Sequence, residues 1–174
     1  ALDHSTRALD FYRTLDQQVW EAEALNEVGW CAARLGDYDT GRTHCRAALP
    51  LHQHHNYPEG EAATLGNLGY IEHHTGHHRR AIRYYQQALT LFRNIDHTHQ
   101  MAITLERLGH PHTALGHHTQ AHAVWREALQ LYHEQGRDND AERVQRQLDT
   151  LDHRPRRGES GTSPRSRWTG PASR

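Results

Sequence analysis

The chain has 174 residues and a formal net charge of −1, and 35 % of its residues are hydrophobic. This length is enough for one domain with a sizeable core. All twenty basic residues are arginine; residues 153–174 hold six of them against one acid, whereas residues 1–152 hold fourteen against twenty acids. An acidic body without a basic stripe argues against direct nucleic-acid binding. No stretch approaches the roughly 18 apolar residues that a membrane helix needs, so we expect no membrane contact.

The sequence resembles itself at a spacing of forty residues, without gaps. Self-similarity at a fixed period is typical of repeat arrays, in which each unit packs only against its neighbours. We therefore expect a core that is distributed along the chain. The positions that match in three successive segments are Leu25, Gly29, Gly36, Ala48, Leu49 and Leu51, then Leu65, Gly69, Gly76, Ala88, Leu89 and Leu91, then Leu105, Gly109, Gly116, Ala128, Leu129 and Leu131.

Each unit is predicted to be a pair of helices. In the first helix of unit one, apolar residues recur at spacings of three and four and form one stripe. Gly36 is expected to end this helix, because glycine readily adopts positive φ, and Asp37 is expected to cap the next one. The predicted array, 1–152, consists of a half unit at 2–15, unit one at 17–55, unit two at 57–95, unit three at 97–135 and a polar capping helix at 138–151.

Two prolines lie inside predicted helices. Pro50 falls in the second helix of unit one, and Pro111 falls in the first helix of unit three. Because proline removes a backbone donor and crowds the preceding turn, at about 3 kcal/mol in a helix interior, we expect a kink or an early stop at both. Residues 153–174 are rich in Arg, Ser, Pro and Gly without periodicity, which predicts a disordered tail.

The two cysteines, Cys31 and Cys45, are too few for a disulfide framework or a thiolate metal site. Both are expected on helices as small core residues, which suits a reducing, cytoplasmic setting. The chain does not start with methionine, and its first predicted helix corresponds to the second helix of a repeat. We therefore expect it to be a segment of a longer protein.

The landmarks of the unit resemble those of the tetratricopeptide repeat. The resemblance implies an all-α fold, an α-solenoid in which antiparallel helix pairs form a right-handed superhelix. Small residues at Gly69 and Ala81 would let paired helices approach closely. The period of forty exceeds the usual 34 or so, and the closing proline of the usual unit is absent. In unit two the resemblance is carried by Leu65, Leu68, Gly69, Gly76, Ala81, Tyr85 and Ala88, and in unit three by Leu105, Leu108, Gly109, Gly116, Ala121, Trp125 and Ala128.

Such long units also resemble the C-terminal repeats of bacterial transcriptional regulators of the antibiotic-regulatory and NB-ARC-type families. In those regulators an ATPase module and a DNA-binding module precede the repeats. This chain contains no G-x-x-x-x-G-K-[ST] motif and no lysine, so a phosphate-binding P-loop cannot be built from it. The resemblance therefore implies only the role of a sensing or protein-binding segment.

In tetratricopeptide arrays the first helices line a concave groove, so the resemblance implies where a partner would bind. One ring stands at the same register of each unit, in Trp30, Tyr70 and His110. Rings along a groove can grip a peptide or helix through apolar area and a polar edge. Alternatively, Trp30 and Tyr70 pack against a neighbouring helix. The predicted partner-binding residues are Glu23, Asn26, Trp30, Arg34, Tyr70, His73, His74, Glu106 and His110.

Histidines crowd two of the predicted turns, and two of them share a helix face at a spacing that can chelate a metal. The chain has no His-Glu-x-x-His motif and no paired carboxylate in the cluster, so we expect no metal site and no cofactor. It also lacks a nucleophile elbow, a catalytic dyad and a glycine-rich phosphate loop, so we expect no enzyme activity. The histidines concerned are His73, His74, His77, His78, His117, His118 and His122.

These observations predict a protein-interaction or sensor module within a larger bacterial regulator. Its groove would hold a partner protein or peptide, or another domain of the same polypeptide. A free-standing adaptor or an oligomerisation scaffold that associates through the ends of the array is the first alternative. A histidine-rich, metal-responsive module is the second.

Overall fold

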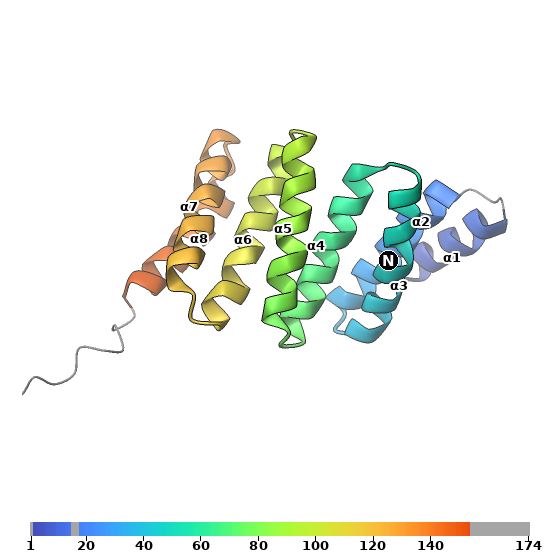
Figure 1. The fold of residues 1–174 in the computed structure, drawn as a ribbon, viewed down its shortest axis with the longest axis horizontal. Helices are drawn as coiled ribbons and strands as arrows, with labels where there is room; N and C mark the ends of the chain where they lie inside the picture. Colours follow the sequence, from blue (N-terminus) through green and yellow to red (C-terminus); the bar gives the residue numbers. More distant parts are fainter. Residues whose placement is uncertain (1, 15–17, 154–174) are drawn as a thin grey trace, which may run out of the picture.

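The computed structural model describes residues 2–14 and 18–153, and there it contains eight α-helices and no strand (Figure 1). The predicted all-α class is confirmed. The predicted tail lies outside the described residues, except for His153. The helices are α1 (Leu2–Thr14), α2 (Gln18–Arg34), α3 (Tyr38–His54), α4 (Pro58–His74), α5 (His78–Asn94), α6 (Thr98–Ala114), α7 (His118–Glu134) and α8 (Asp138–Asp152).

Successive helices pair and stack into an elongated array, with α1 to α3 at one end and α7 and α8 at the other (Figure 1). α2 packs on α3, α4 on α5 and α6 on α7, and the pairs join through α3 with α4 and α5 with α6. The first helices of neighbouring units also touch, α2 with α4 and α4 with α6, whereas the second helices are not in comparable contact. The first helices are therefore closer together and form the inner side of the array.

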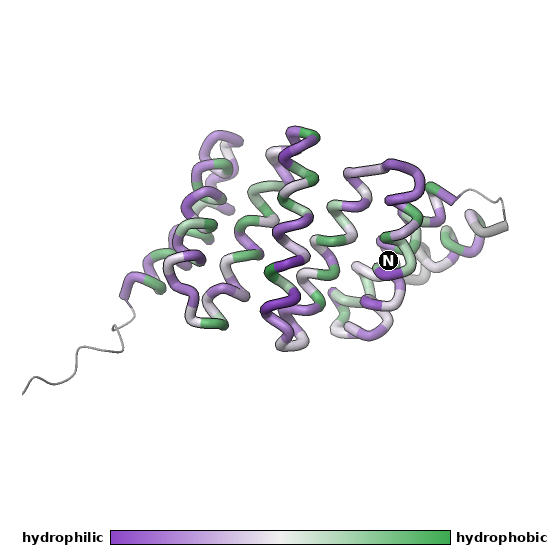
Figure 2. The backbone as a smooth tube through the Cα atoms, in the orientation of Figure 1, coloured by the Kyte–Doolittle hydropathy of each residue, from purple (hydrophilic) through white to green (hydrophobic). Residues whose placement is uncertain are grey.

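Hydrophobic residues occur along all the described helices (Figure 2), and the buried ones form four clusters instead of one centre. Around α5 to α8 the core is built on Tyr85, Trp125 and Tyr132, which are at most 3 % exposed. Towards the other end smaller residues such as Leu25 and Val28 fill this role. Each helix pair can bury its apolar stripe only against its neighbours, which is the packing of a repeat array. Among the helices described, none is long and apolar enough to span a bilayer.

The turns between helices end on residues in the left-handed region of the backbone. Within units this residue is glycine, as predicted for Gly36, and Asp37 then caps α3 by accepting a hydrogen bond from the Thr40 amide at 3.1 Å. Asn and Asp also tolerate this conformation, and they occupy it at two turns between units. The residues with positive φ are Gly36 (90°), Gly76 (80°), Gly116 (74°), Gly136 (64°), Asn56 (51°) and Asp96 (53°).

The early helix stop expected at the two prolines is wrong. α3 continues from Pro50 to His54, and α6 continues from Pro111 to Ala114. Each proline removes only its own backbone donor, and the turn that follows is still closed. After Pro111, for example, the Leu115 amide donates to the Pro111 carbonyl at 3.2 Å. Both prolines lie near the end of their helix, where few hydrogen bonds depend on the crowded turn.

Glycines in the first helices allow the paired helix to come close. A Cβ at Gly69 would stand 2.8 Å from the Tyr85 ring, and one at Gly109 would stand 2.1 Å from Nε1 of Trp125. Neither aromatic ring could keep its place against an alanine. Gly66, one turn earlier on α4, has nothing within 4 Å of an added Cβ.

Alanine should therefore have opposite effects at two helical glycines. We expect Gly66→Ala to raise the free energy of unfolding by about 0.5–1 kcal/mol, because alanine restricts the unfolded chain. Gly109→Ala should lower it by about 1–3 kcal/mol, because the Trp125 ring must move out of a packed core. Urea denaturation followed by circular dichroism measures both. Equal effects at the two sites would contradict this account of helix pairing.

Candidate functional site

The inner side of the array carries two aromatic rings from neighbouring units. Trp30 of α2 and Tyr70 of α4 are half-buried, and their ring centroids are 5.1 Å apart in an edge-to-face arrangement. The predicted third ring does not continue this pair. The His110 ring lies against Trp125 at 5.6 Å and against His73 at 6.0 Å. Two of the three predicted rings are therefore in direct contact, and the third is linked to Tyr70 only through the rings of His73 and His74.

The place next to the two rings is taken by Arg107 of α6, which the sequence analysis did not single out. Its guanidinium carbon is 4.9 Å from the Trp30 centroid and 5.8 Å from the Tyr70 centroid. Arg34 approaches Trp30 as well, at 5.4 Å. Such contacts are cation–π interactions, in which the cation faces the electron-rich ring. Arg107 thus joins the first helices of units one, two and three.

Arg107 keeps its hydrogen-bonding capacity for a ligand. Within the part of the chain that the structure describes, its guanidinium group forms no hydrogen bond and no ion pair, although the side chain is half-buried. A guanidinium group carries five N–H donors in one plane. Because no described residue engages these donors, they remain available to a carboxylate. In the sequence, only the position of Arg107 directly after Glu106, a predicted groove residue, indicated that it could take part in binding.

Two other predicted groove residues, Asn26 and Glu106, face into the protein. Asn26 is 8 % exposed, and its Oδ1 accepts a hydrogen bond from Nδ2 of Asn67 at 3.0 Å, which ties α2 to α4. Glu106 is 7 % exposed and accepts from the Tyr132 hydroxyl at 2.7 Å and from Nε of Arg143 at 2.6 Å. Burial, together with the hydrogen bond to Glu106, raises the pKa of Tyr132. Both residues link helices beneath the groove.

The remaining predicted residues lie at the inner surface. Glu23 is half-buried, and burial with the nearby Glu59 carboxylate raises its pKa. His74 is exposed and stacks near Tyr70 with ring centroids 4.0 Å apart. His73 is half-buried, and its Nδ1 lies 3.2 Å from Nδ1 of His78. Burial, followed by the neighbouring histidines, lowers the pKa of His73 to about 4.

The histidine clusters do not assemble a metal centre in the described part of the chain. No three His, Cys, Asp or Glu side chains there are placed to hold one ion. His118 and His122, which share a helix face, are not joined by a third ligand. His122 instead lies 3.8 Å from the carboxylate of Asp152. Cys45 is buried, and the Cys31 thiol donates to a carboxylate oxygen of Glu27 at 3.4 Å.

The inner side continues onto α8, which the sequence analysis treated only as a cap. Its residues stand at the forty-residue register of the earlier first helices, so that Thr150 corresponds to His110. A hollow of about 360 Å³ opens here between α6, α7 and α8. The inner side thus extends from Glu23 on α2 to this hollow at α8, whose two arginines are each paired with acidic side chains. The hollow is lined by Thr113, Trp125, Arg143, Arg146, Gln147, Thr150 and Leu151.

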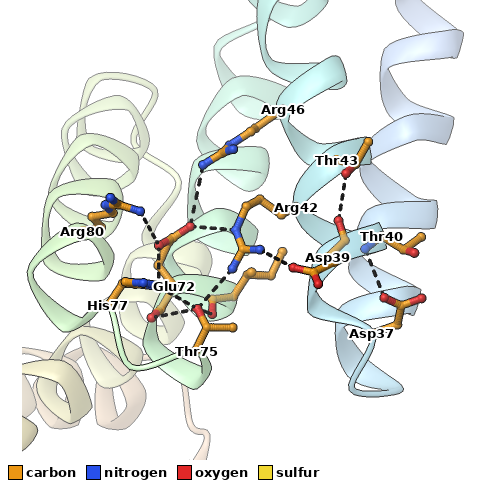
Figure 3. Close-up of polar contacts among 11 residues, drawn as sticks. Asp37, Asp39, Thr40, Arg42, Thr43, Arg46, Glu72, Thr75, His77 and Arg80 are labelled. Atoms are coloured by element: carbon orange, nitrogen blue, oxygen red, sulfur yellow. Dashed lines mark hydrogen bonds and ion pairs between the residues drawn. The ribbon is translucent and has the colours of Figure 1, made fainter.

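A second polar cluster, on the opposite side of α4, was missed by the sequence analysis. The Glu72 side chain is fully buried, and three arginines and a histidine surround its carboxylate (Figure 3). Arg42 is the closest, with Nε donating at 2.9 Å. His77 lies at 3.2 Å, Arg80 at 3.7 Å and Arg46 at 3.9 Å. One carboxylate thus connects α3, α4 and α5.

Comparison with known proteins agrees with this architecture. Residues 20–94 match the family model of the tetratricopeptide repeat. Among 69 matching chains of solved structures is BtubC (BKLC) from P. vanneervenii, with a TM-score of 0.72 and 17 % identity. The match covers 86 % of this chain and 63 % of that chain, so this chain spans less than two thirds of its length. No curated protein matches. The fold is thus a tetratricopeptide-like α-solenoid.

Removing the buried charge at Glu72 should loosen the junction of α3, α4 and α5. We expect Glu72→Gln to lower the free energy of unfolding by about 1–3 kcal/mol, because Arg42 keeps its charge but loses its buried partner. Urea denaturation measures the change. Asp39→Asn is the control, since Asp39 contacts Arg42 from a side chain that is 96 % exposed. A loss as large in the control as in Glu72→Gln would contradict a special role of the buried carboxylate.

Acid should destabilise the fold through histidines that are held neutral. The pKa of His73 is about 4 in the folded chain, against an ordinary 6.5. Between these values the unfolded chain binds a proton that the folded chain does not. The stability that the neutral His73 contributes is therefore fully present above about pH 6.5 and is lost as the pH falls towards 4. The same direction holds for His52, His110 and His112, whose pKa values are lowered mainly by burial.

We expect the melting temperature to be lower at about pH 5 than at about pH 7.5. The difference should be smaller in His73→Gln, because that variant has no proton to exchange at this position. His133→Gln, which changes an exposed histidine of α7, should keep the difference of the unmodified chain. Differential scanning calorimetry at the two pH values tests this. If His73→Gln leaves the difference unchanged, His73 is not one of the responsible groups.

Proposed function

Because tetratricopeptide repeats generally mediate protein–protein interactions and their fold is typically a non-enzymatic scaffold, we propose that this chain is a partner-binding module. It holds a segment of a partner protein in the groove formed by α2, α4, α6 and α8. One observation carries the proposal: the guanidinium group of Arg107 lies over Trp30 and Tyr70 and donates no hydrogen bond to any described residue. A guanidinium group that is held in place in this way can bind an anionic ligand group.

The surroundings of Arg107 indicate the chemistry of the partner segment. Its N–H edge matches a carboxylate, and a charge-assisted bond of this kind is roughly twice as strong as a neutral one. Trp30 and Tyr70 add apolar ring surface beside that edge. At the other end of the groove, the Glu23 carboxylate repels acidic residues. The acidic residue of the bound segment therefore lies at Arg107 and not at Glu23. We therefore propose a segment with an acidic residue next to an apolar one.

The residues proposed to contact the segment differ from the predicted set in two respects. Arg107 is added. Asn26 and Glu106 are proposed to support the groove and not to touch the partner, because their polar atoms are already bonded inside the protein. The contact residues are then Glu23, Trp30, Arg34, Tyr70, His73, His74, Arg107 and His110.

We propose the larger context on sequence resemblance alone. The array, 1–152, would be the sensor segment of a cytoplasmic bacterial transcriptional regulator, and the groove would hold a partner or another domain of that protein. Peptide mapping of the native polypeptide tests this, since a regulator must contain a P-loop peptide outside residues 1–174. A different observation favours a stand-alone adaptor. The rings of Phe11 on α1 and Trp20 on α2 are 58 % and 54 % exposed, which suits association through this end of the array.

The proposed function is tested by selecting random displayed peptides on the whole chain. We expect the selected peptides to be enriched in Asp or Glu beside an apolar residue. Arg107→Gln should weaken the binding of a selected peptide about tenfold or more, because it removes the charge that pairs with the carboxylate. Fluorescence polarisation with the labelled peptide measures the affinity.

Arg83→Gln is the matched control, because it removes the same charge from an exposed site on α5 that does not line the groove. It should leave the affinity within about twofold. Circular dichroism should show the same helix content in all variants. Selected peptides without acidic residues, or equal binding by Arg107→Gln and the unmodified chain, would contradict the proposal.

A further inference from the structure

A second set of arginines lies away from the groove, where the outer helices α3 and α5 flank Glu72 (Figure 3). Glu72 forms the floor of this place, with a side chain that is 0 % exposed. Arg46 approaches its carboxylate from α3 and Arg80 from α5. We call these two residues and Glu72 the outer arginine site.

Arg46 and Arg80 are only loosely engaged with Glu72. Their nitrogens lie 3.9 Å and 3.7 Å from the carboxylate oxygens, which is beyond hydrogen-bond distance, and their side chains are 55 % and 54 % exposed. Neither guanidinium group donates a hydrogen bond within residues 2–14 and 18–153. Arg42 is different, because it donates to Glu72 at 2.9 Å, to Asp39 at 2.7 Å and to Thr75 at 3.2 Å.

The charges of the site do not cancel. Three arginines, Arg42, Arg46 and Arg80, face two carboxylates, Glu72 and Asp39, which leaves one positive charge. The loosely held arginines carry this excess, because Arg42 is bonded to both acids. Because the guanidinium groups of Arg46 and Arg80 both lie next to the Glu72 carboxylate, one ligand group can contact both of them without a change in the backbone.

The same register in the neighbouring units does not reproduce this arrangement. The residue at the Glu72 position is Ala32 in unit one and His112 in unit three, and the counterpart of Arg80 in unit three is Gln120. Among the helix junctions that the structure describes, only that of α3, α4 and α5 thus combines a buried acid with an arginine on each side. The repeat architecture does not require it, since the other junctions form without it.

We propose that the outer arginine site binds a phosphate monoester dianion, carried by a phosphorylated serine or threonine of a partner protein. A phosphate group has three oxygens that can accept hydrogen bonds from two guanidinium groups at once, whereas one carboxylate is satisfied by a single guanidinium fork. Arg46 and Arg80 contact the phosphate. Glu72 does not contact it and acts as a positioning residue, because it holds the two arginines in place.

The test uses the whole chain, with nitrogen-15 labelling of the arginine side chains. A short glycine-flanked phosphoserine peptide is titrated at about pH 7.5, where a phosphate monoester is mostly dianionic. We expect saturable shifts of the Nε–Hε signals of Arg46 and Arg80. In the double variant Arg46→Gln/Arg80→Gln the affinity should fall about tenfold or more, because both charge-assisted contacts are lost. Circular dichroism checks that the variant is folded.

Arg126→Gln is the matched control, because Arg126 is exposed, stands on α7 at the register of Arg46 and is not part of the outer arginine site. It should leave the affinity within about twofold. An equal loss in this control, or shifts that do not saturate, would overturn the proposal in favour of general charge attraction. Equal binding of the unphosphorylated peptide would overturn it as well. Binding of inorganic phosphate without binding of the phosphopeptide would overturn the assignment to a phosphorylated partner.

Discussion

The architecture depends on the close approach of two helices at one glycine in each unit. At Gly29, Gly69 and Gly109 an added Cβ would stand 2.6, 2.8 and 2.1 Å from an atom of the paired helix. No other residue type leaves this space. Because the contact recurs every forty residues, each unit repeats the same pairing, and the first helices come to lie side by side. The groove follows from this stacking.

The side chain of the paired helix that packs against this glycine differs from unit to unit, and its hydrogen bonds differ as well. It is the Cys45 thiol in unit one, the Tyr85 ring in unit two and the Trp125 indole in unit three. The indole also donates from Nε1 to the Glu106 carbonyl at 2.9 Å, next to the carboxylate that Arg143 binds. Unit three is thus tied to α8 by polar contacts, which holds the segment that carries Arg107 in a defined place.

Both proposed binding sites use arginines that a neighbour holds in place, but the neighbours differ. Arg107 is held over the faces of Trp30 and Tyr70, and no residue that the structure describes uses the hydrogen-bond donors of its guanidinium group. Arg46 and Arg80 are held by the charge of Glu72, which lies too far away to use their donors fully. An array whose residues 1–152 carry more acids than bases can therefore offer a local positive site on its inner side and another on its outer side.

The sequence by itself determined the helix pairs and the α-solenoid, because apolar spacing, glycine turns and helix caps are local signals that recur with the period. The resemblance to tetratricopeptide repeats also predicted that Trp30 and Tyr70 lie on the inner side. Only the tertiary structure decided what a buried polar side chain contacts. Glu106 and Glu72 stand at positions that are buried in the other units as well, where the residues are Asn26 and Gly66 or Ala32 and His112. The forty-residue repeat treats these positions as equivalent. The roles of Glu106, Glu72 and Arg107 therefore depend on which side chains of the adjacent helices lie close to them.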